Sequence, residues 1–540
     1  MQRFIERYDG RNYDVIIVGG GVTGAAIAYE AASRGLAVAL IEKRDFGWAT
    51  SAATSKMIHG GLRYLYYGEL GLVRESLQER RILENIAPNY VYPLPILAPL
   101  YKSSWTVRAG LALYDLIAYD KKWTWDKDKR LPNHRMVAVD ELMQMAPHVR
   151  PQGLESAALY YDCQSSFPER LTLAFVRSAV AMGAHVANHA QALDAICPLE
   201  RRVGGVKARD LLSGAEIDLR GSLVVNCGGP WADLILQPGC AAEASPRIRR
   251  SEGIHFITPK LKSSWGVVLW TDDGRHLFVL PWRGHTLVGT TDKEYNGDPD
   301  NYRVTKQSVE ELLATLNSCY GDGKLAYEDI VFAYGGLRPL VEDHVEGTYQ
   351  ASRRYEIHDN AAEGVEGLIT IEGGKYTTSR NLAEKAMKVI GRKLGRDLPP
   401  SATAGKPLNG CEMRGVESFV AEMKNLHADF PADTVEVMAR NYGAQCGQVL
   451  ELARAEPELA RRSAFDGEIM AGVAFAVRHE MARTLADAVL RRTGLGALGQ
   501  PAPGVLEQAA DICAAELGWS AEKRQREIDD VNGWLRLPID

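Results

Sequence analysis

The sequence predicts an α/β fold built on a Rossmann-type parallel sheet, with an inserted antiparallel-sheet domain and a C-terminal α-helical domain. Three observations lead to this prediction. A strand, a glycine-rich turn, a helix and a second strand follow one another over residues 13–42. Short strand-like runs separated by Gly, Pro and Asp come next, and strand signals vanish from about Asp397 onward.

The first strand and its turn have the pattern of a dinucleotide-binding unit. Residues 15–18 are apolar and β-branched, which is typical of a strand buried on both faces. Gly19, Gly21 and Gly24 follow in GxGxxG spacing. The first glycine allows a tight bend, the second lets the backbone approach a pyrophosphate, and the third lets the next helix pack closely.

The helix and second strand complete a Rossmann-type βαβ unit. The helix predicted at 25–33 points its unpaired N–H groups at the phosphates. A second apolar strand at 36–41 ends in Glu42, which is placed to bind the adenosine ribose hydroxyls. A nucleotide cofactor is therefore the first hypothesis.

Apolar runs later in the chain predict further strands. Residues 223–226 form a buried strand whose glycine-rich turn, 227–231, returns beside the cofactor. Residues 277–280 and 286–289 read as a hairpin, with 254–257 as a partner strand in an antiparallel sheet.

Helical patterns dominate the last part of the chain, at 416–423, 470–492 and 503–517. We expect residues 397–540 to form an α-helical domain joined through the linker 399–401. The preceding region, 1–396, is then divided into cofactor-binding parts at about 13–90, 150–245 and 350–396, and substrate parts at about 91–149 and 246–349.

Composition narrows the functional classes. With 46% hydrophobic and 24% charged residues the chain is ordinary for a globular protein, and its net charge of -6 argues against general nucleic-acid binding. The eight cysteines contain no CxxC pair, so neither a zinc site nor an iron–sulfur cluster, and hence no metal, is predicted. The N-terminus lacks a secretory pattern and the longest apolar run, 109–119, is too short to span a bilayer. We expect a protein that is soluble or lies on a membrane surface.

Three glycine pairs are each followed by a cation: Gly60-Gly61 by Arg63, Gly335-Gly336 by Arg338, and Gly373-Gly374 by Lys375. Taken singly, each has about even odds of being a turn with a solvated cation. Together they favour a pocket for a dianion such as phosphate. A helix predicted to start near Thr377 would add the positive end of its dipole beside a cofactor ring.

The segment 101–135 holds eight Lys or Arg against four Asp, interleaved with Trp and Tyr. This composition fits attraction to anionic lipid headgroups with aromatic insertion. A solvated cap over the substrate domain has equal weight.

Several motifs resemble the FAD-dependent glycerol-3-phosphate dehydrogenase family. In chain order they are ATSAATSKMIHGGLRYL (49–65), NCGGPW (226–231), GTTDKEY (289–295), GGLRPL (335–340), EGGKYTTSR (372–380) and HEMARTLADAVLRRTGLG (479–496). The N-terminal glycine motif is similar too, so the resemblance covers nearly the whole chain.

The resemblance implies a D-amino-acid-oxidase-like (DAO) FAD fold and oxidation of sn-glycerol 3-phosphate to dihydroxyacetone phosphate by hydride transfer to flavin N5. It implies electron transfer to a membrane quinone, a cytoplasmic protein peripheral on the inner face of the cell membrane, and it allows a homodimer. Motif matching gives the substrate-binding cations Arg63, Arg338, Arg353 and Lys375. The cofactor-binding residues are Gly19, Gly20, Gly21, Thr23, Gly24, Glu42, Lys43, Thr50, Ser51, Ser55, Lys56, His59, Gly60, Gly61, Gly228, Trp231, Gly374, Lys375, Tyr376 and Thr377.

The predicted catalytic residues are His255, Arg338 and Lys375. Oxidising a secondary alcohol requires a hydride acceptor and removal of the hydroxyl proton. His255 is the base at neutral pH, and Arg338 or Lys375 stabilises the alkoxide. Two alternatives stay open: a purely structural His255, and cations that lower the alcohol pKa while water takes the proton.

Other functions also stay open. The stretch 164–170, with Cys227, Gly228 and Ser379, departs from the usual family pattern, so a related polyol phosphate such as erythritol phosphate is an alternative substrate. An oxidase that uses O2 is a second alternative. An amine or amino-acid oxidase would need one Arg with a Tyr for its substrate carboxylate, and a redox sensor with a relic site would have lost the cations; the cations disfavour both.

Overall fold

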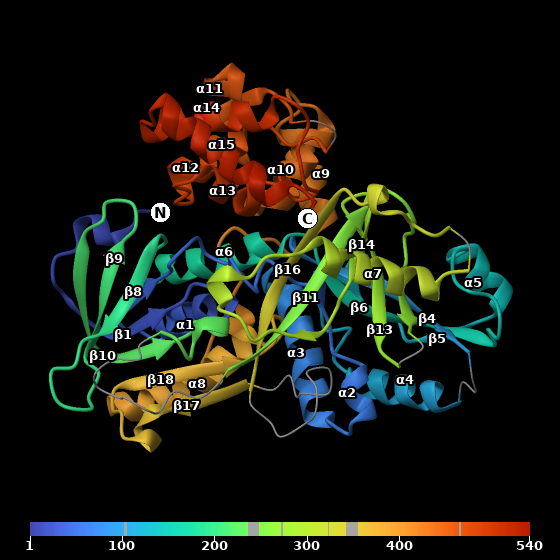
Figure 1. The fold of residues 1–540 in the computed structure, drawn as a ribbon, viewed down its shortest axis with the longest axis horizontal. Coiled ribbons are helices and arrows are strands. Elements are labelled where there is room, and N and C mark those ends of the chain that lie inside the picture. Colours follow the sequence, from blue (N-terminus) through green and yellow to red (C-terminus); the bar gives the residue numbers. More distant parts are fainter. Residues whose placement is uncertain are drawn as a thin grey trace.

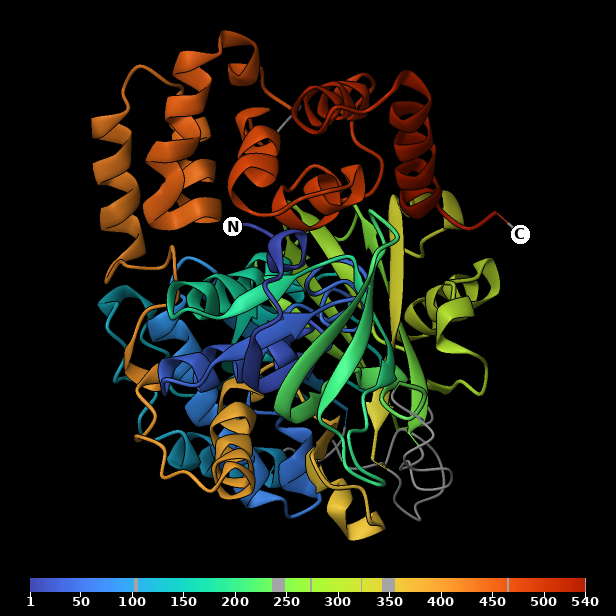
Figure 2. The ribbon, with the colours of Figure 1, turned by 90° about the vertical axis from the view of Figure 1, so that its left-hand side faces the viewer.

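The computed structural model describes residues 1–101, 105–235, 248–271, 274–321, 323–341, 355–463 and 466–539. Two sheets lie side by side, and a helical domain sits across one end of both (Figures 1 and 2).

The first sheet is the predicted parallel sheet, with strand order β17-β18-β10-β1-β2-β7. Strands β18, β10, β1, β2 and β7 run parallel, while β17 is an antiparallel edge and the β8–β9 hairpin extends from β10. The bounds are β1 (Asn12–Val18), β2 (Val38–Ile41), β7 (His185–Ala187), β8 (Ala190–Ala195), β9 (Gly205–Asp210), β10 (Glu216–Asn226), β17 (Tyr355–Asp359) and β18 (Leu368–Gly373).

Strand β1 is buried on both faces, as its apolar run predicts. Val15 and Ile17 pack against α1 (Val22–Ser33), α6 (Pro168–Ala181) and α8 (Ser379–Leu394), whereas Ile16 and Val18 belong to a separate core under β8 and β9. The predicted strand 223–226 is the end of β10 and lies directly beside β1. Its glycine-rich turn therefore meets the first glycine turn at the carboxyl edge of the sheet.

The second sheet has the order β15-β11-β14-β13-β12-β4-β6-β3, with β16 paired to β11 and β5 to β6. The predicted hairpin is confirmed as β13 and β14, joined where Trp282 faces His285, and 254–257 lies in β11 beside β14. The bounds are β3 (Met57–Ile58), β4 (Val91–Leu100), β5 (Arg135–Val137), β6 (Ser156–Ser165), β11 (Arg249–Thr258), β12 (Gly266–Trp270), β13 (His276–Trp282), β14 (His285–Gly289), β15 (Lys293–Glu294) and β16 (Phe332–Leu340).

Helices also join successive strands of the second sheet: α2 (Arg63–Tyr66), α3 (Leu70–Ile86), α4 (Trp105–Ile117), α5 (Val139–Met145) and α7 (Lys306–Cys319). The C-terminal domain contains α9 (Val416–Leu426), α10 (Ala432–Tyr442), α11 (Cys446–Ala455), α12 (Ala471–His479), α13 (Leu485–Asp487), a π-helical turn (Ala488–Arg492), α14 (Val505–Leu517) and α15 (Ala521–Leu535). None of the described helices combines the length and apolarity needed to cross a bilayer.

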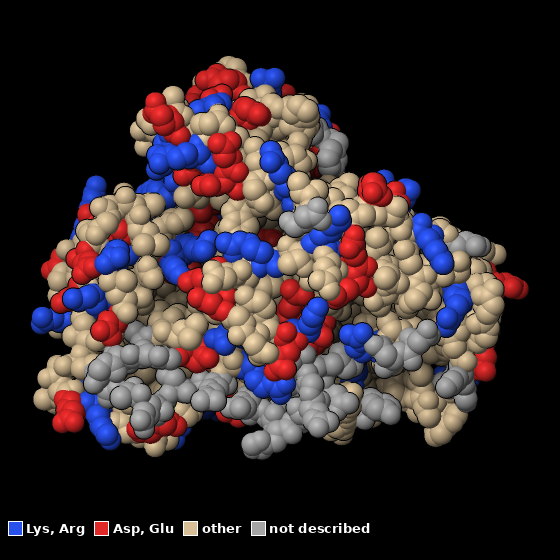
Figure 3. All heavy atoms as spheres, viewed as in Figure 1, with Lys and Arg blue, Asp and Glu red and all other residues tan. Residues whose placement is uncertain are grey.

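The helical pattern predicted over 470–492 does not form one continuous helix. Helix α12 ends at His479, and Met481 has a left-handed φ of 62°. At this break the Glu480 carboxylate lies against α6, where it pairs with Arg170 and Arg177. A second buried pair, Asp45 with Arg492, joins the same two domains. Both pairs are interior, whereas charges of both signs are intermixed on the outer face in Figure 3.

Candidate functional site

The glycine turn after β1 adopts a backbone that only glycine permits. Gly19 has a φ of +106°, and a Cβ there would lie 2.5 Å from the Cys227 carbonyl oxygen. A Cβ on Gly24 would lie 1.9 Å from the Gly19 oxygen. Helix α1 begins at Val22, whose N–H donates to Ser51 Oγ at 2.9 Å. The amino end of α1, at Gly21, Val22 and Thr23, lines a cavity, as a pyrophosphate site requires.

Glu42 lies at the end of β2, beside this turn. Its carboxylate accepts the Gly20 N–H at 2.6 Å and the Arg44 N–H at 2.8 Å. Burial raises its pKa, although both N–H groups oppose the shift. The Lys43 Nζ donates to Asp300 at 2.8 Å.

A cavity of 460 Å³ runs from the glycine turn past Glu42 to the turn after β18. Twelve of the twenty predicted cofactor residues line it: Gly19, Gly21, Thr23, Glu42, Lys43, Thr50, Ser51, Gly228, Trp231, Gly374, Lys375 and Tyr376. Helix α8 begins just beyond, at Ser379, so its positive end lies near Tyr376. The glycine turn, the Glu42 carboxylate and the cavity that runs between them and Tyr376 together fit an extended dinucleotide.

The other eight predicted cofactor residues do not line the cavity. The Gly20 N–H donates to Glu42, and Gly24 packs against Gly19, so both glycines support the turn without lining the cavity. Gly61 has a left-handed φ of 76°. The His59 N–H donates to Thr377 Oγ1 at 3.3 Å, and the Gly60 N–H donates to Asp162 at 3.2 Å. Burial lowers the pKa of His59 to about 4. The two remaining residues, Ser55 and Lys56, turn toward the second sheet.

His255 lies on β11 and is almost fully buried. Its Nε2 lies 2.8 Å from Ser55 Oγ, and its ring stacks on Tyr334 with 5.1 Å between centroids. Burial, and then the charges of Arg338 and Lys56, hold the pKa of His255 well below its usual value. The imidazole is therefore neutral at pH 7.

Arg338 reaches the same sheet from β16, where it faces Ser251 across the ladder. Its guanidinium donates to Thr290 Oγ1 at 2.6 Å and to the Thr291 carbonyl at 3.0 Å. It leaves no room for a side chain at Gly253, where a Cβ would lie 2.0 Å from Nη2. Arg338 is thus oriented on the sheet that carries His255.

Lys375 and Arg63 form a second group of cations around Tyr64. Lys375 Nζ lies 3.7 Å from the centre of the Tyr64 ring, and Arg63 lies 5.4 Å from it. His276 belongs here too, since burial and then Arg63 and His59 lower its pKa to about 4. Tyr64 lies within the motif at 49–65 but was not among the predicted site residues, and neither was His276. Arg353 lies outside the described residues.

Across the described ranges, no three His, Cys, Asp or Glu side chains gather as a metal site would require. The arrangement can hold an anion at the cations and accept a proton at a neutral imidazole.

The chain is similar to proteins of known families. Residues 14–380 match the family model described as FAD dependent oxidoreductase, and residues 401–524 match the C-terminal domain of alpha-glycerophosphate oxidase. A glycerol-3-phosphate dehydrogenase of Synechocystis sp. is 32% identical over 97% of this chain and 96% of its own. An alpha-glycerophosphate oxidase of Streptococcus pyogenes is 28% identical over 98% of this chain and 95% of its own.

The fold is also similar to a solved structure. The crystal structure of a glycerol-3-phosphate dehydrogenase from Bacillus halodurans, complexed with FAD, superposes with a TM-score of 0.80 at 26% identity. The similarity covers 100% of this chain and 98% of that one.

Proposed function

Because the chain belongs to the FAD-dependent glycerol-3-phosphate dehydrogenase family, we propose that it oxidises sn-glycerol 3-phosphate to dihydroxyacetone phosphate and passes the electrons to a quinone. The observation that carries this proposal is the neutral, buried His255 on the same sheet as Arg338, with Lys375 and Arg63 as further cations. The cavity lined by the glycine turn and Tyr376 would hold FAD, which would supply the two-electron oxidant.

Each residue has a task in the reaction. Lys375 and Arg63 bind the phosphate dianion, for which several donors are the expected solution. His255 accepts the hydroxyl proton, and Ser55 holds the imidazole in place at 2.8 Å. Arg338, anchored by Thr290 and Thr291, stabilises charge that develops on the substrate oxygen.

An exposed apolar surface supports membrane contact. Trp105 and Leu116 on α4 are 69% and 70% exposed, and Tyr119 and Trp123, which follow the helix in the chain, are exposed as well. Such a cluster is unusual on a soluble surface and fits insertion at a headgroup layer.

Only some of the Lys and Arg side chains of the segment 101–135 are exposed at the surface. Arg108, Lys122, Lys127 and Arg130 are exposed, whereas Lys121 and Lys129 are buried. We infer that this surface docks peripherally on anionic lipid at the inner face of the cell membrane.

The remaining alternatives differ from this proposal in the electron acceptor or in the substrate. The similarity to an alpha-glycerophosphate oxidase keeps O2 as a second acceptor. A related polyol phosphate such as erythritol phosphate would use the same cations. An amino-acid oxidase is disfavoured because Arg63, Lys375 and Arg338 exceed what one carboxylate needs.

The test is anaerobic bleaching of the flavin absorbance by glycerol 3-phosphate, beside erythritol phosphate, free glycerol and glycine. We expect rapid bleaching by glycerol 3-phosphate alone, and reoxidation by quinone faster than by O2. Arg338→Ala should slow bleaching sharply and leave the flavin bound. Bleaching by glycine, or by none of the four compounds, would contradict the proposal.

A further inference from the structure

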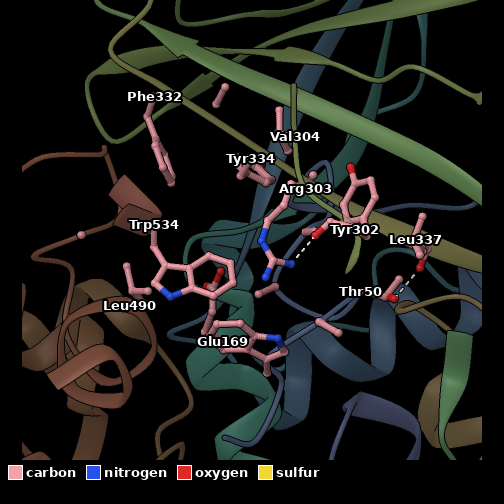
Figure 4. Close-up of a pocket in the computed structure, with 18 of the residues that line it drawn as sticks. Thr50, Glu169, Tyr302, Arg303, Val304, Phe332, Tyr334, Leu337, Leu490 and Trp534 are labelled. Atoms are coloured by element: carbon pink, nitrogen blue, oxygen red, sulfur yellow. Dashed lines mark hydrogen bonds between the residues drawn. The ribbon is translucent and has the colours of Figure 1, made fainter. Parts of the chain in front are cut away.

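Lys56 is a predicted cofactor residue that does not line the cofactor cavity, and none of the steps proposed above uses it. It lines a second cavity, of 520 Å³, which carries eight aromatic side chains where the C-terminal domain meets the two sheets. Figure 4 shows Leu490 and Trp534 on the C-terminal side of this cavity, with Tyr334 of β16 and Glu169 of α6 on its other walls. Lys56 therefore lies beside the second sheet, which carries the proposed base.

The Lys56 ammonium group is buried and held from two sides. The residue has a left-handed φ of 59°, which is uncommon for any residue with a side chain and recurs at functional sites. Its Nζ donates to the Glu169 carboxylate at 2.7 Å and to the Ala52 carbonyl at 3.0 Å. Glu169 lies in the first turn of α6, where the positive end of the helix dipole favours a charged carboxylate. The fold thus fixes a positive charge at one point of the interior.

Three consecutive residues of this segment contact the stacked rings of His255 and Tyr334. The Thr54 carbonyl accepts the Tyr334 hydroxyl at 2.8 Å, and Ser55 Oγ lies 2.8 Å from His255 Nε2. Lys56 Nζ lies 5.0 Å from the centre of the Tyr334 ring, in the range of a cation–π contact. The planes of the two rings differ by 17°. Lys56 therefore supports the ring on which the imidazole stacks.

Two cations act on the imidazole. Burial has the largest effect on the pKa of His255, and the charges of Arg338 and then Lys56 lower it further. Arg338 lies 4.0 Å from Asp292, and Lys56 is paired with Glu169. Within the described ranges, no other charged side chain shifts the protonation of this ring.

The charge of Lys56 can be changed while the proposed substrate cations stay in place. Arg338 already has a task at the substrate oxygen, whereas Lys56 has none. Only 4% of the Lys56 side chain and 9% of the Glu169 side chain are exposed, so solvent screens this charge weakly.

We propose that Lys56 is a positioning residue for His255: its fixed charge keeps the imidazole unprotonated, and its contact with Tyr334 holds the ring in place. A general base must be unprotonated at the working pH before it accepts a proton. Glu169 and the Ala52 carbonyl keep the ammonium group at a constant distance from the ring. The inference rests on the proposed function only for the role of His255 as base.

The first experiment measures the protonation of His255 without turnover. The oxidised holoenzyme is prepared with isotope-labelled histidine, and the NMR signal of His255 is identified by its absence in His255→Ala. Lys56→Gln removes the charge and keeps an N–H donor for Glu169. We expect the His255 signal to titrate about one pH unit higher than in the wild type, as for one charge at about 10 Å in a protein interior. If His255 titrates as in the wild type, or at no pH at which the flavin stays bound, the proposal is overturned.

Matched variants separate charge from packing. Lys56→Arg keeps the charge and should titrate like the wild type. Lys424→Gln makes the same change in a partly exposed pair with Glu436 on α9 and should also leave His255 unchanged. Equal shifts in Lys56→Gln and Lys56→Arg would mean that packing and not charge sets the protonation, which would refute the proposal. Lys56→Met is a second neutral variant that serves if Lys56→Gln does not fold.

The second experiment follows the rate of flavin bleaching by glycerol 3-phosphate as a function of pH. Because the base must be unprotonated, a higher pKa of His255 moves the acid-side fall in rate to higher pH. In Lys56→Gln this fall should move by the same amount as the NMR titration, and Lys424→Gln should not move it. A shifted titration with an unshifted bleaching profile would mean that His255 is not the base, and the proposed task of Lys56 would fail with it. If glycerol 3-phosphate bleaches none of the proteins, the proposed function fails, while the NMR titration still decides whether Lys56 controls the ring.

Discussion

A buried ion pair holds the C-terminal domain to the cofactor region, and removal of one partner tests its contribution. Glu480 is fully buried and accepts N–H groups from Arg170 at 2.8 and 3.0 Å and from Arg177 at 2.8 Å. Glu480→Ala leaves the Arg170 cation desolvated without a carboxylate, which costs about 3–5 kcal/mol. Arg170 keeps the carbonyl oxygens of Asn441 and Arg492 as acceptors, so we expect the lower end of that range.

Urea unfolding at pH 7, followed by tryptophan fluorescence, measures the change in free energy of unfolding. Asp429→Ala is the control, because it removes the carboxylate of the exposed pair with Arg454 and should cost no more than about 1 kcal/mol. If Glu480→Ala costs no more than Asp429→Ala, the buried pair does not stabilise the domain junction and the reasoning is wrong.

The contribution of the pair depends on pH. Burial alone would raise the pKa of Glu480, but Arg170 and Arg177 lower it below its usual value. A carboxyl group whose folded pKa is lowered stabilises the protein above its unfolded pKa of about 4.3, and this stabilisation is lost as pH falls through the folded value. The difference between wild type and variant should therefore be constant from pH 7 to about 5 and shrink in more acidic solution.

Three further predictions concern the cofactor, the base and the membrane surface. Gly24→Ala should abolish FAD binding, because the new Cβ would lie 1.9 Å from the Gly19 oxygen; a full flavin absorbance in the purified variant would show that this close packing is not needed. His255→Ala should slow flavin bleaching by roughly 10²- to 10⁴-fold and keep the flavin bound. Since the pKa of His255 is lowered, the wild-type bleaching rate should fall only at pH values below the usual histidine range, and a fall centred near pH 6.5 or above would contradict this. Combined Trp105→Ser and Leu116→Ser changes should reduce sedimentation with anionic vesicles several-fold, and unchanged sedimentation would exclude α4 as the docking surface.

Much of the cofactor cavity could be predicted because its residues lie close together in the sequence. The glycines at 19, 21 and 24 and the acid at 42 are spaced by the geometry of a single βαβ unit. The same applies to the β13–β14 hairpin, whose register depends on a short local turn.

Side-chain directions were harder to predict. Lys43, Ser55 and Lys56 belong to cofactor motifs, yet their side chains contact Asp300, His255 and Glu169, respectively, which come from distant parts of the chain. A motif specifies a residue type and a position, but packing against remote strands decides where a long side chain points.

The helix break at Glu480 shows the same limit. Residues 470–492 carry a continuous helical pattern, but the carboxylate of Glu480 is stabilised by Arg170, which lies more than 300 residues earlier. A periodicity argument counts apolar positions and cannot include an ion pair across a domain junction.

By itself, the sequence determined the parallel sheet, the dinucleotide turn, the helical C-terminal domain and the cations predicted to bind the substrate, because local spacing and hydrophobic periodicity encode each of them. Only the tertiary structure decided that Arg338 shares a sheet with His255 while Lys375 and Arg63 gather at Tyr64, and that an aromatic cavity forms against the C-terminal domain. These features arise where segments hundreds of residues apart pack together, and the free energy of that packing depends on shape and burial that no single segment carries.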